Sequence, residues 1–385
     1  MKWETVRLGD IIDFSNGINF DKSAYTQGIK IVGVSDFGNL FSPNYDELSE
    51  VKSDIVKSKD LLKNGDIVFV RSNGNKELVG RCMLVKKLPY PVTYSGFCIR
   101  ARINSPNSYN SVFLTYYFKS MFFRKLLSGS SVGANIQNLS QARLSNCTIS
   151  IPHIQTQKRI AGILSAYDDL IENNQKQIKL LEEAAQRLYK EWFVDLRFPD
   201  HEHTAVVDGV PEGWRKQTVG SVIKKIDRTK QIKTSDYLSA GKVPVIDQSK
   251  KYIAGYTNDE ESIVDIDKPV IVFGDHTRIL KYITFPFAKG ADGTQLIVSN
   301  DACIPQSLLY CSLLHIDLSN YHYARHFKYL KAEEIILPTK NTASRFMFIA
   351  DYIFNRIQCL RNTIAKSQQA RDRLLPKLMS GEMEV

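Results

Sequence analysis

The sequence lacks the features that would place it in several large protein classes. Its six cysteines stand singly, without a CxxC pair, so neither a zinc site nor a disulfide framework is indicated. No apolar run approaches the roughly 18 residues that a membrane-spanning helix requires. The opening MKWETVRLGD has no apolar segment typical of a signal peptide. We therefore expect a cytoplasmic protein with reduced cysteines.

Motifs for nucleotide and methyl-donor chemistry are also absent. The segment GNKELVGR has neither the spacing nor the Lys-Ser/Thr ending of a phosphate-binding loop, which argues against ATP hydrolysis. No strand-like run leads into a glycine-rich turn with an acidic residue downstream. The Asn/Asp-Pro-Pro-aromatic tetrad with which amino-methyltransferases hold a flipped base is missing too. We expect no catalytic site and no bound cofactor in this chain.

Two groups of possible metal ligands have simpler explanations. His201 and His203 belong to the polar connector RFPDHEHTAVVDG, which is typical of a solvated linker. Asp46, Glu50 and Lys52 imitate the acidic cluster and lysine of a nuclease, but such spacing arises by chance in any charged loop. We predict no metal site at either place.

The charge balance is the first positive feature. A formal net charge of +10 and a pI near 9.1 favour a polyanionic partner, because each cation placed on a phosphate releases counterions from nucleic acid. Many basic proteins bind no DNA, so this observation alone is weak. The length of 385 residues allows two or three domains.

One helical segment occurs twice in related form. EEAAQRLYKEWF (182–193) and QQARDRLLPKLM (368–379) are 186 residues apart, as 370 − 184 gives for their shared alanines. Each ends a pattern in which apolar or small residues recur at steps of four and three, which is the seam of a coiled coil. The first seam comprises Ile160, Leu164, Tyr167, Ile171, Asn174, Ile178, Leu181, Ala185, Leu188 and Trp192. Adding 186 gives Phe346, Ala350, Ile353, Ile357, Leu360, Ile364, Ser367, Arg371, Leu374 and Leu378.

The segments around each helix repeat as well. Pro152 and Pro338 keep the offset of 186, while Trp3 and Trp214 are 211 residues apart. Before each helix lie short β-type runs such as GDIVFV and KPVIVF, mixed with helical stretches, which predicts α+β domains. The predicted order is domain 1–152, helix 153–198, connector and domain 199–338, and helix 339–385.

The partner of the seam is open to two interpretations. A long heptad helix on its own favours a dimerisation zipper between chains. Here the second copy lies in the same chain, so we expect an intramolecular antiparallel coiled coil with a pseudo-twofold internal repeat, which separates two globular domains. Asn174 on the seam would fix the register, and Pro376 would begin the end of the second helix.

Polar loops after two equivalent strands contain candidate DNA contacts. After GDIVFV come Arg71, Ser72, Asn73, Asn75, Lys76 and Arg81, and after VIVF come Asp275, His276, Thr277, Arg278 and Lys281. Arg suits guanine edges, Asn suits adenine edges, and Ser, Thr and His are adaptable contacts. Equivalent positions carry different residues, which predicts two recognition surfaces with different specificity. The alternative is that these are solvated turns.

Further candidates lie just before each helix. SGSSVGANIQNLS (128–140) contributes Asn135 and Gln137, FAKGADGTQLIV contributes Lys289, and YHYARHFKYLK (321–331) contributes Arg325, His326 and Lys328. Small polar loops approach phosphates through their N–H groups, and basic–aromatic mixtures suit phosphates and sugars. We expect Tyr323 and Phe327 to be packed in the core instead.

The chain resembles the specificity subunits of type I restriction-modification systems over nearly its whole length. The resemblance is carried by SGSSVGANIQNLSQARLSNCTISIPHIQTQKRIAGILSAYDDLIENNQKQIKLLEEAAQRLYKEWF, by the connector RFPDHEH with GVPEGW, by VFGDHTRILKYITFPFAKGADG, and by YARHFKYLK leading to ILP. It implies two target-recognition domains and two conserved spacer helices.

The resemblance also implies a function. The subunit would be non-catalytic, each domain would recognise one half of a gapped duplex DNA site, and the helices would set the gap. Two modification subunits would dock on the helices and contribute S-adenosylmethionine and the adenine methyltransferase site, while restriction subunits would contribute ATP- and Mg²⁺-dependent cleavage. For the helix surface that binds partners we expect Arg187, Tyr189, Trp192, Phe193, Arg373, Leu375 and Met379.

Two other functions stay open at this point. A stand-alone nuclease would need the catalytic cluster that the sequence does not contain. A coiled-coil adaptor that binds DNA without sequence specificity would share the helices and the positive charge.

Overall fold

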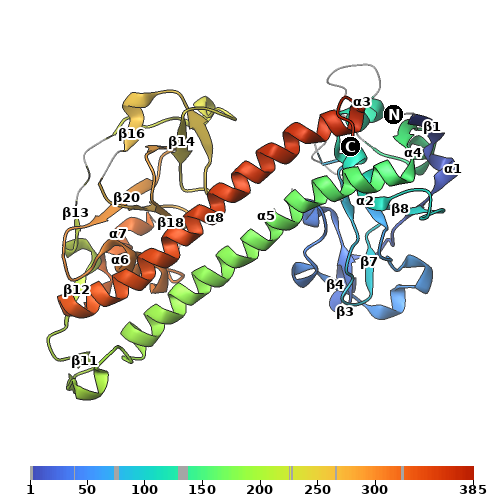
Figure 1. The fold of residues 1–385 in the computed structure, drawn as a ribbon. Helices are drawn as coiled ribbons and strands as arrows, with labels where there is room; N and C mark the ends of the chain where they lie inside the picture. The colour runs from blue at the N-terminus through green and yellow to red at the C-terminus, as the bar shows by residue number, and fades with distance from the viewer. Residues whose placement is uncertain are drawn as a thin grey trace. The chain divides into compact units, whose positions relative to one another are not determined.

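The computed structural model describes residues 3–38, 40–72, 78–128, 138–224, 226, 229–264, 267–321 and 325–385. The chain forms two compact units. Unit 1 comprises residues 1–173 and 364–385, and unit 2 comprises residues 174–363. The division crosses both long helices, so each unit combines one globular domain with the start of one helix and the end of the other (Figure 1).

Unit 1 contains two main sheets. The antiparallel four-stranded sheet has the order β2 (Ile12–Asn16), β8 (Cys98–Ile103), β5 (Ile67–Val70) and β6 (Cys82–Leu84). The second sheet has the order β4 (Glu50–Val51), β3 (Tyr25–Val32) and β7 (Val92–Tyr94), with β3 and β7 parallel. Strand β1 (Trp3–Arg7) pairs with β9 (Thr148–Pro152), and short helices are α1 (Leu8–Ile11), α2 (Ser111–Lys119), α3 (Met121–Ser128) and α4 (Gln141–Ser145).

Unit 2 repeats this plan. Its antiparallel sheet has the order β13 (Ile223–Lys224), β20 (Thr294–Ser299), β17 (Val270–Gly274) and β18 (Leu280–Ile283). The second sheet has the order β15 (Gly255–Thr257), β14 (Val243–Ile246), β19 (Phe287–Lys289) and β16 (Ile263–Val264), with β14 and β19 parallel. Strand β12 (Arg215–Thr218) pairs with β21 (Glu334–Leu337), β10 (Val206–Val207) with β11 (Val210–Pro211), and the short helices are α6 (Gln306–His315) and α7 (His326–Ala332).

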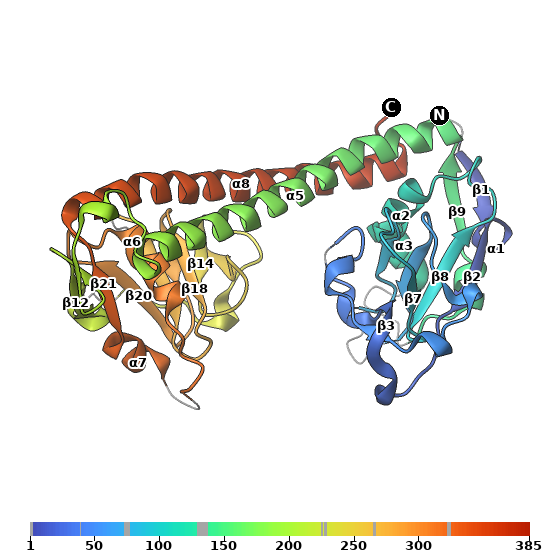
Figure 2. The same ribbon diagram turned by 90° about the horizontal axis from the view of Figure 1, so that it is seen from below.

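The matching strand orders confirm the predicted α+β class and the internal repeat. In each unit one short helix packs between the four-stranded sheet and the long helices. In unit 1 the Asn110 side chain caps α2 by accepting from the Phe113 N–H, and Phe113 is fully buried. In unit 2, Leu308 and Leu309 of α6 share one core with Ile357 of the long helix. Figure 2 shows α6 beside the long helices. Apolar burial therefore fixes each domain on its stretch of helix.

The long helices are α5 (Ile154–Tyr189), which continues as a π turn over Lys190–Val194, and α8 (Lys340–Ser380). The sequence predicted helices within residues 153–198 and 339–385. Pro376 lies inside α8, one turn before its end at Ser380. The next residue, Gly381, has a φ of +75° and provides the left-handed cap that glycine adopts readily. None of the described helices is long and apolar enough to cross a membrane.

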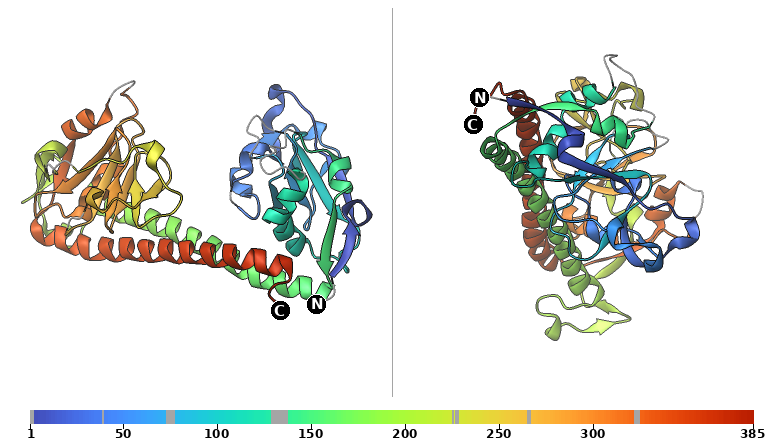
Figure 3. Two further views of the ribbon diagram at one scale, coloured as in Figure 1. Left: turned by 90° about the horizontal axis from the view of Figure 1, so that it is seen from above. Right: turned by 90° about the vertical axis from the view of Figure 1, so that its right-hand side faces the viewer.

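The predicted seam is buried or half-buried along its length, and the two helices pair with each other in antiparallel fashion within each unit. In unit 1, Leu164 near the start of α5 shares a core with Leu378 near the end of α8. In unit 2, Ala185 near the end of α5 shares a core with Phe346 near the start of α8. Figure 3 shows the helices side by side in each unit. The seam is therefore filled within the chain, as expected from the repeat.

Asn174 lies buried on this seam, with 4% of its surface exposed. Its Nδ2 has no hydrogen-bond partner among the residues that the structure describes. Its expected role in fixing the register stays a prediction.

Candidate nucleic-acid interface

The candidate surface of unit 1 begins where β5 ends. The Arg71 N–H donates to the Phe97 carbonyl at 2.8 Å, and the Arg71 carbonyl accepts from the Leu139 N–H at 2.9 Å. The guanidinium donates through Nη1 to the Gly96 carbonyl at 3.3 Å. Arg71 therefore joins three separate segments, and the turn that it supports presents Phe97 with 63% of its surface exposed.

Unit 2 has the same framework where β17 ends. The Asp275 N–H donates to the Gly293 carbonyl at 2.7 Å, and the Asp275 carbonyl accepts from the His326 N–H at 2.9 Å. The carboxylate caps α7 by accepting from the Phe327 N–H at 2.8 Å. The shared backbone bonds make Arg71 and Asp275 equivalent. One framework thus carries a cation in unit 1 and a buried anion in unit 2.

Three loops of unit 2 form one connected surface, comprising 247–251, 275–278 and 290–293. Gln248 joins them: its Oε1 accepts from the His276 N–H at 3.1 Å, and its Nε2 donates to the Asp292 carbonyl at 2.8 Å. The Thr277 hydroxyl donates to the Gln248 carbonyl at 2.7 Å. The sequence prediction missed Gln248, although VPVIDQSKKY places a polar run directly after a buried strand.

The prediction that Lys281 contacts DNA is wrong. Lys281 lies on β18, opposite Val272, and is only 5% exposed. Its ammonium donates to the Asp247 carbonyl at 2.7 Å and to the Lys251 carbonyl at 2.5 Å. Burial lowers the pKa of Lys281 to about 8, and the Asp247 carboxylate 3.8 Å away acts against this shift. The lysine supports the first of the three loops from beneath.

His326 is likewise unsuited to direct contact. It opens α7 with only 7% of its surface exposed, and its Nδ1 has no partner among the described residues. Its neighbours Arg325 and Lys328 are exposed, and their contact with DNA stays a prediction. Phe327 is half-buried and packs 6.1 Å from the Phe273 ring, as expected for a core aromatic.

The remaining candidates differ in exposure. His276, Thr277 and Arg278 are exposed, with Arg278 also donating to the Leu318 carbonyl at 3.0 Å. Lys289 is half-buried, and burial lowers its pKa despite the opposing charge of Asp292. Half-buried positions in unit 1 are Ser72, which forms a β-bridge with Asn138, and Arg81. The predicted contacts Asn73, Asn75, Lys76, Asn135 and Gln137, and the predicted core residue Tyr323, lie outside the described residues.

Four of the predicted partner contacts belong to the interior instead. Tyr189, Trp192 and Phe193 are buried in the core of unit 2, and Met379 is buried in the core of unit 1. Trp192 and Phe193 both pack on Phe346 of α8. The prediction was wrong because the last turns of each helix are covered by the unit's own domain. Arg187 and Arg373 are exposed, and Leu375 is half-buried against the core.

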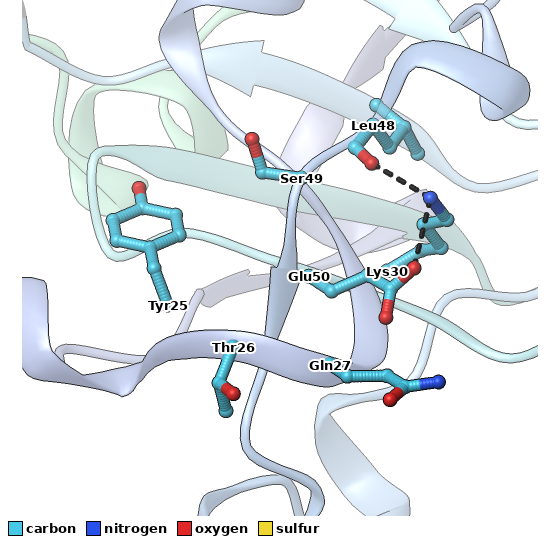
Figure 4. A pocket seen from close by; sticks show the side chains of 7 residues that line it. All are labelled: Tyr25, Thr26, Gln27, Lys30, Leu48, Ser49 and Glu50. Atoms are coloured by element: carbon cyan, nitrogen blue, oxygen red, sulfur yellow. Dashed lines mark hydrogen bonds and ion pairs between the residues drawn. The ribbon is translucent and has the colours of Figure 1, made fainter.

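A polar hollow on the surface of unit 1 contains one lysine, Lys30, whose ammonium is already paired. It is lined by Tyr25, Thr26, Gln27, Lys30, Leu48, Ser49 and Glu50 (Figure 4). The Lys30 ammonium lies 3.0 Å from the Glu50 carboxylate and donates to the Leu48 carbonyl. The Gly28 N–H and Lys30 lower the pKa of Glu50. Glu50 is therefore already paired, and no group of three possible metal ligands occurs within the described part of the chain.

Comparison with known proteins identifies the family. Residues 1–183 match the family model described as the type I restriction modification DNA specificity domain. The chain is 26% identical over 303 residues to the type I restriction enzyme MjaIX specificity subunit of Methanocaldococcus jannaschii, a match covering 71% of this chain and 69% of the relative. Residues 1–183 belong to this specificity-domain family, and the chain as a whole is similar to the specificity subunits of type I restriction-modification systems. These are recognition subunits, not catalytic ones.

A second relative and a solved structure agree with this assignment. The HindI specificity subunit of Haemophilus influenzae is 30% identical over 218 residues, which cover 54% of this subunit and 44% of the relative. The crystal structure of the S subunit of a type I system from M. genitalium superposes with a TM-score of 0.61 at 16% identity, covering 98% of this chain and 96% of that one. The latter likeness establishes a common fold.

Proposed function

We propose that this specificity subunit recognises a bipartite, gapped duplex DNA site, with one half-site for each unit. The observation that carries the proposal is the equivalence of Arg71 and Asp275. Their backbone bonds are the same, so the framework is conserved between the units. Their side chains differ, because the buried Asp275 carboxylate caps α7, whereas the half-buried Arg71 guanidinium holds the turn that exposes Phe97. The residues exposed beside these two positions differ as well, with Phe97 in unit 1 and His276, Thr277 and Arg278 in unit 2. Two identical half-sites would call for like residues at these positions.

The exposed residues of unit 2 suit both kinds of DNA contact. His276 and Thr277 lie on the loop that Gln248 supports, and their side chains are of the types that bond base edges. Arg278, Arg325 and Lys328 supply cations for phosphates or guanine. In unit 1, Arg71 and Ser72 hold the corresponding place. A protein of this kind acts where chromosomal DNA lies, so we expect it in the cytoplasm.

The helices would bind two modification subunits, one at each copy of the repeat. A partner that docks twice needs the same exposed residues twice. Ile163 and Ile349 meet this condition, since 349 − 163 is 186, and they are 37% and 39% exposed. Arg187 and Arg373, also 186 apart, are both exposed. These four residues replace the buried aromatics as candidate contacts. S-adenosylmethionine would bind to the modification subunits, and ATP and Mg²⁺ to restriction subunits.

Co-expression tests this function. The subunit is produced with the modification subunit of the same source in a host without adenine methylation, and modified adenines are located by sequencing. A single gapped motif with two different halves supports the proposal. A stable complex that methylates nothing, or methylates without sequence preference, contradicts it, and the second result would favour an adaptor without specificity.

A nuclease remains the alternative from another class. Incubating the purified chain with duplex DNA and Mg²⁺ tests it directly. We expect intact DNA, because no group of three possible metal ligands lies among the described residues.

A further inference from the structure

Lys281 is a buried lysine that lies beneath the three surface loops of unit 2. A lysine ammonium is costly to remove from water unless each of its protons is bonded and its charge is balanced. The Lys281 ammonium donates to the Asp247 and Lys251 carbonyls, and the Asp247 carboxylate 3.8 Å away supplies the opposite charge. Both carbonyls belong to the same loop, so one side chain holds the two ends of the turn 247–251.

The Asp247 carboxylate extends this support. It accepts from the Ser249 N–H at 2.9 Å and from the Ser249 hydroxyl at 2.6 Å. It also accepts from the Tyr237 hydroxyl at 3.3 Å, and that hydroxyl in turn accepts from the Ala291 N–H at 2.9 Å. A chain of bonds thus runs from Lys281 through Asp247 to the loop 290–293.

Close packing shows how little freedom these loops have. A Cβ built on Gly290 would lie 2.3 Å from the Tyr237 hydroxyl and 2.8 Å from the Asp247 Cβ. One built on Gly293, where φ is +82°, would lie 2.7 Å from the His276 ring. Both glycines let the loops approach closely. A shift of the loop 247–251 would therefore be transmitted to the other two through Gln248 and Tyr237.

We propose that Lys281 is a positioning residue for base recognition by unit 2: it fixes the loop 247–251, and through Gln248 and Asp247 it sets the places of His276 and Asp292. The proposal rests on the proposed function, since it assigns a role within the second half-site. It replaces the direct contact that the sequence suggested with an indirect one, because Lys281 itself is out of reach of DNA.

The test compares Lys281→Met with the wild type in the co-expressed methylation complex. Methionine keeps most of the side-chain volume but leaves both carbonyls without their donor. We expect the half-site recognised by unit 2 to lose selectivity at one or more bases by about tenfold or more, in line with the value of a well-placed base contact. The half-site recognised by unit 1 should stay unchanged and serves as an internal control.

Two further measurements separate positioning from general destabilisation. Hydrogen exchange should accelerate at the Ser249, His276 and Ala291 amides in Lys281→Met, while the Val272 amide in the sheet stays protected. Lys281→Arg, which retains donors and charge, should recover part of the selectivity. Lys251→Met, which removes an exposed cation but keeps the carbonyl that accepts from Lys281, should leave base preference unaltered.

The outcomes distinguish a failure of the proposed function from a failure of the positioning role of Lys281. A wild-type chain without a two-part motif overturns the proposed function itself. A wild-type motif that is unchanged in Lys281→Met, with the three loop amides still protected, overturns the positioning role and leaves the function intact. Equal loss of both half-sites in Lys281→Met would also overturn it, because it would show global damage.

Discussion

The two units differ most at positions where their backbones agree. At the end of β5 and of β17 the same pair of backbone bonds holds Arg71 in unit 1 and Asp275 in unit 2. Around this position unit 2 builds its surface from three loops bonded through Gln248, whereas unit 1 uses the Arg71 guanidinium to hold the turn that presents Phe97. The two units therefore share the backbone hydrogen bonds at this position but expose different side chains.

The helices show the same division between repeated framework and individual detail. In unit 1 the two long helices are joined by an ion pair between Asp168 of α5 and Arg371 of α8. The Tyr116 hydroxyl of α2 donates to the same Asp168 carboxylate. The equivalent positions in unit 2, 371 − 186 and 168 + 186, are Ala185 and Phe354, which are apolar and buried. Unit 2 has its own pair, with Arg361 3.0 Å from Glu182 and stacked 3.8 Å from the Tyr252 ring. Each domain is therefore tied to the helices by a different polar cluster.

The largest expected effect comes from breaking the core of one unit only. Phe346→Ala removes a fully buried ring that packs on Trp192 and Phe193, and it should lower the free energy of unfolding of unit 2 by about 3–5 kcal/mol. Thermal unfolding followed by limited proteolysis should show early cleavage within residues 174–363 while unit 1 persists. The matched control is Phe348→Ala, on the same helix but 81% exposed, which should change stability little. If both units unfolded at the same temperature, the expectation that unit 1 stays folded without unit 2 would be contradicted.

The polar cluster of unit 1 offers a sharper comparison. Asp168→Ala removes the acceptor of the Tyr116 hydroxyl and of the Arg371 Nη1, and it leaves Arg371 paired with Asp372 alone. This loss should cost about 2–3 kcal/mol of unfolding free energy. The double variant Asp168→Phe with Arg371→Ala copies the apolar pair of unit 2 and should recover part of that loss. Denaturant unfolding of the three proteins measures this. If the double variant is no more stable than Asp168→Ala, the apolar pair of unit 2 cannot replace the polar cluster of unit 1.

The buried lysine of unit 2 predicts a pH effect. The pKa of Lys281 is about 8 in the folded chain, below the ordinary value of about 10.5. The penalty for burying its charge is complete below pH 8 and is relieved as the pH rises, because the folded chain then releases a proton that the unfolded chain keeps. Relative to Lys281→Met, the wild type should gain about 1 kcal/mol per pH unit between about pH 8.5 and 10. Parallel curves for both proteins would refute the lowered pKa.

The smallest expected effect concerns the exposed repeat. Arg187→Ala and Arg373→Ala should each weaken docking of one modification subunit severalfold without affecting protein stability, since both side chains are exposed. Titration calorimetry with the purified modification subunit measures the two sites. A variant that loses both docking events at once would show that the copies do not act separately.

The helices were predictable from the sequence, whereas the recognition surface was predictable only in part. The seam from Ile160 to Trp192 is periodic, and a period of 3.5 residues specifies a buried stripe wherever the partner lies. Trp192 stood on this seam, so its burial was implied even where the helix ends were expected to bind a partner. Lys281 follows a polar loop, and only the pairing with Val272 places it inside the sheet. Gln248 acts through loops that are distant in sequence, a relation that periodicity does not express.

The central claim is that the two units recognise separate half-sites with different side chains on a common framework. Methylated adenines should be mapped for the wild type and for Arg71→Ala and His276→Ala, each co-expressed with the modification subunit. We predict that Arg71→Ala relaxes bases in one half of the motif only, and that His276→Ala relaxes bases in the other half only, with the gap unchanged in both. If both substitutions altered the same half, or if neither altered any base, the account would be contradicted.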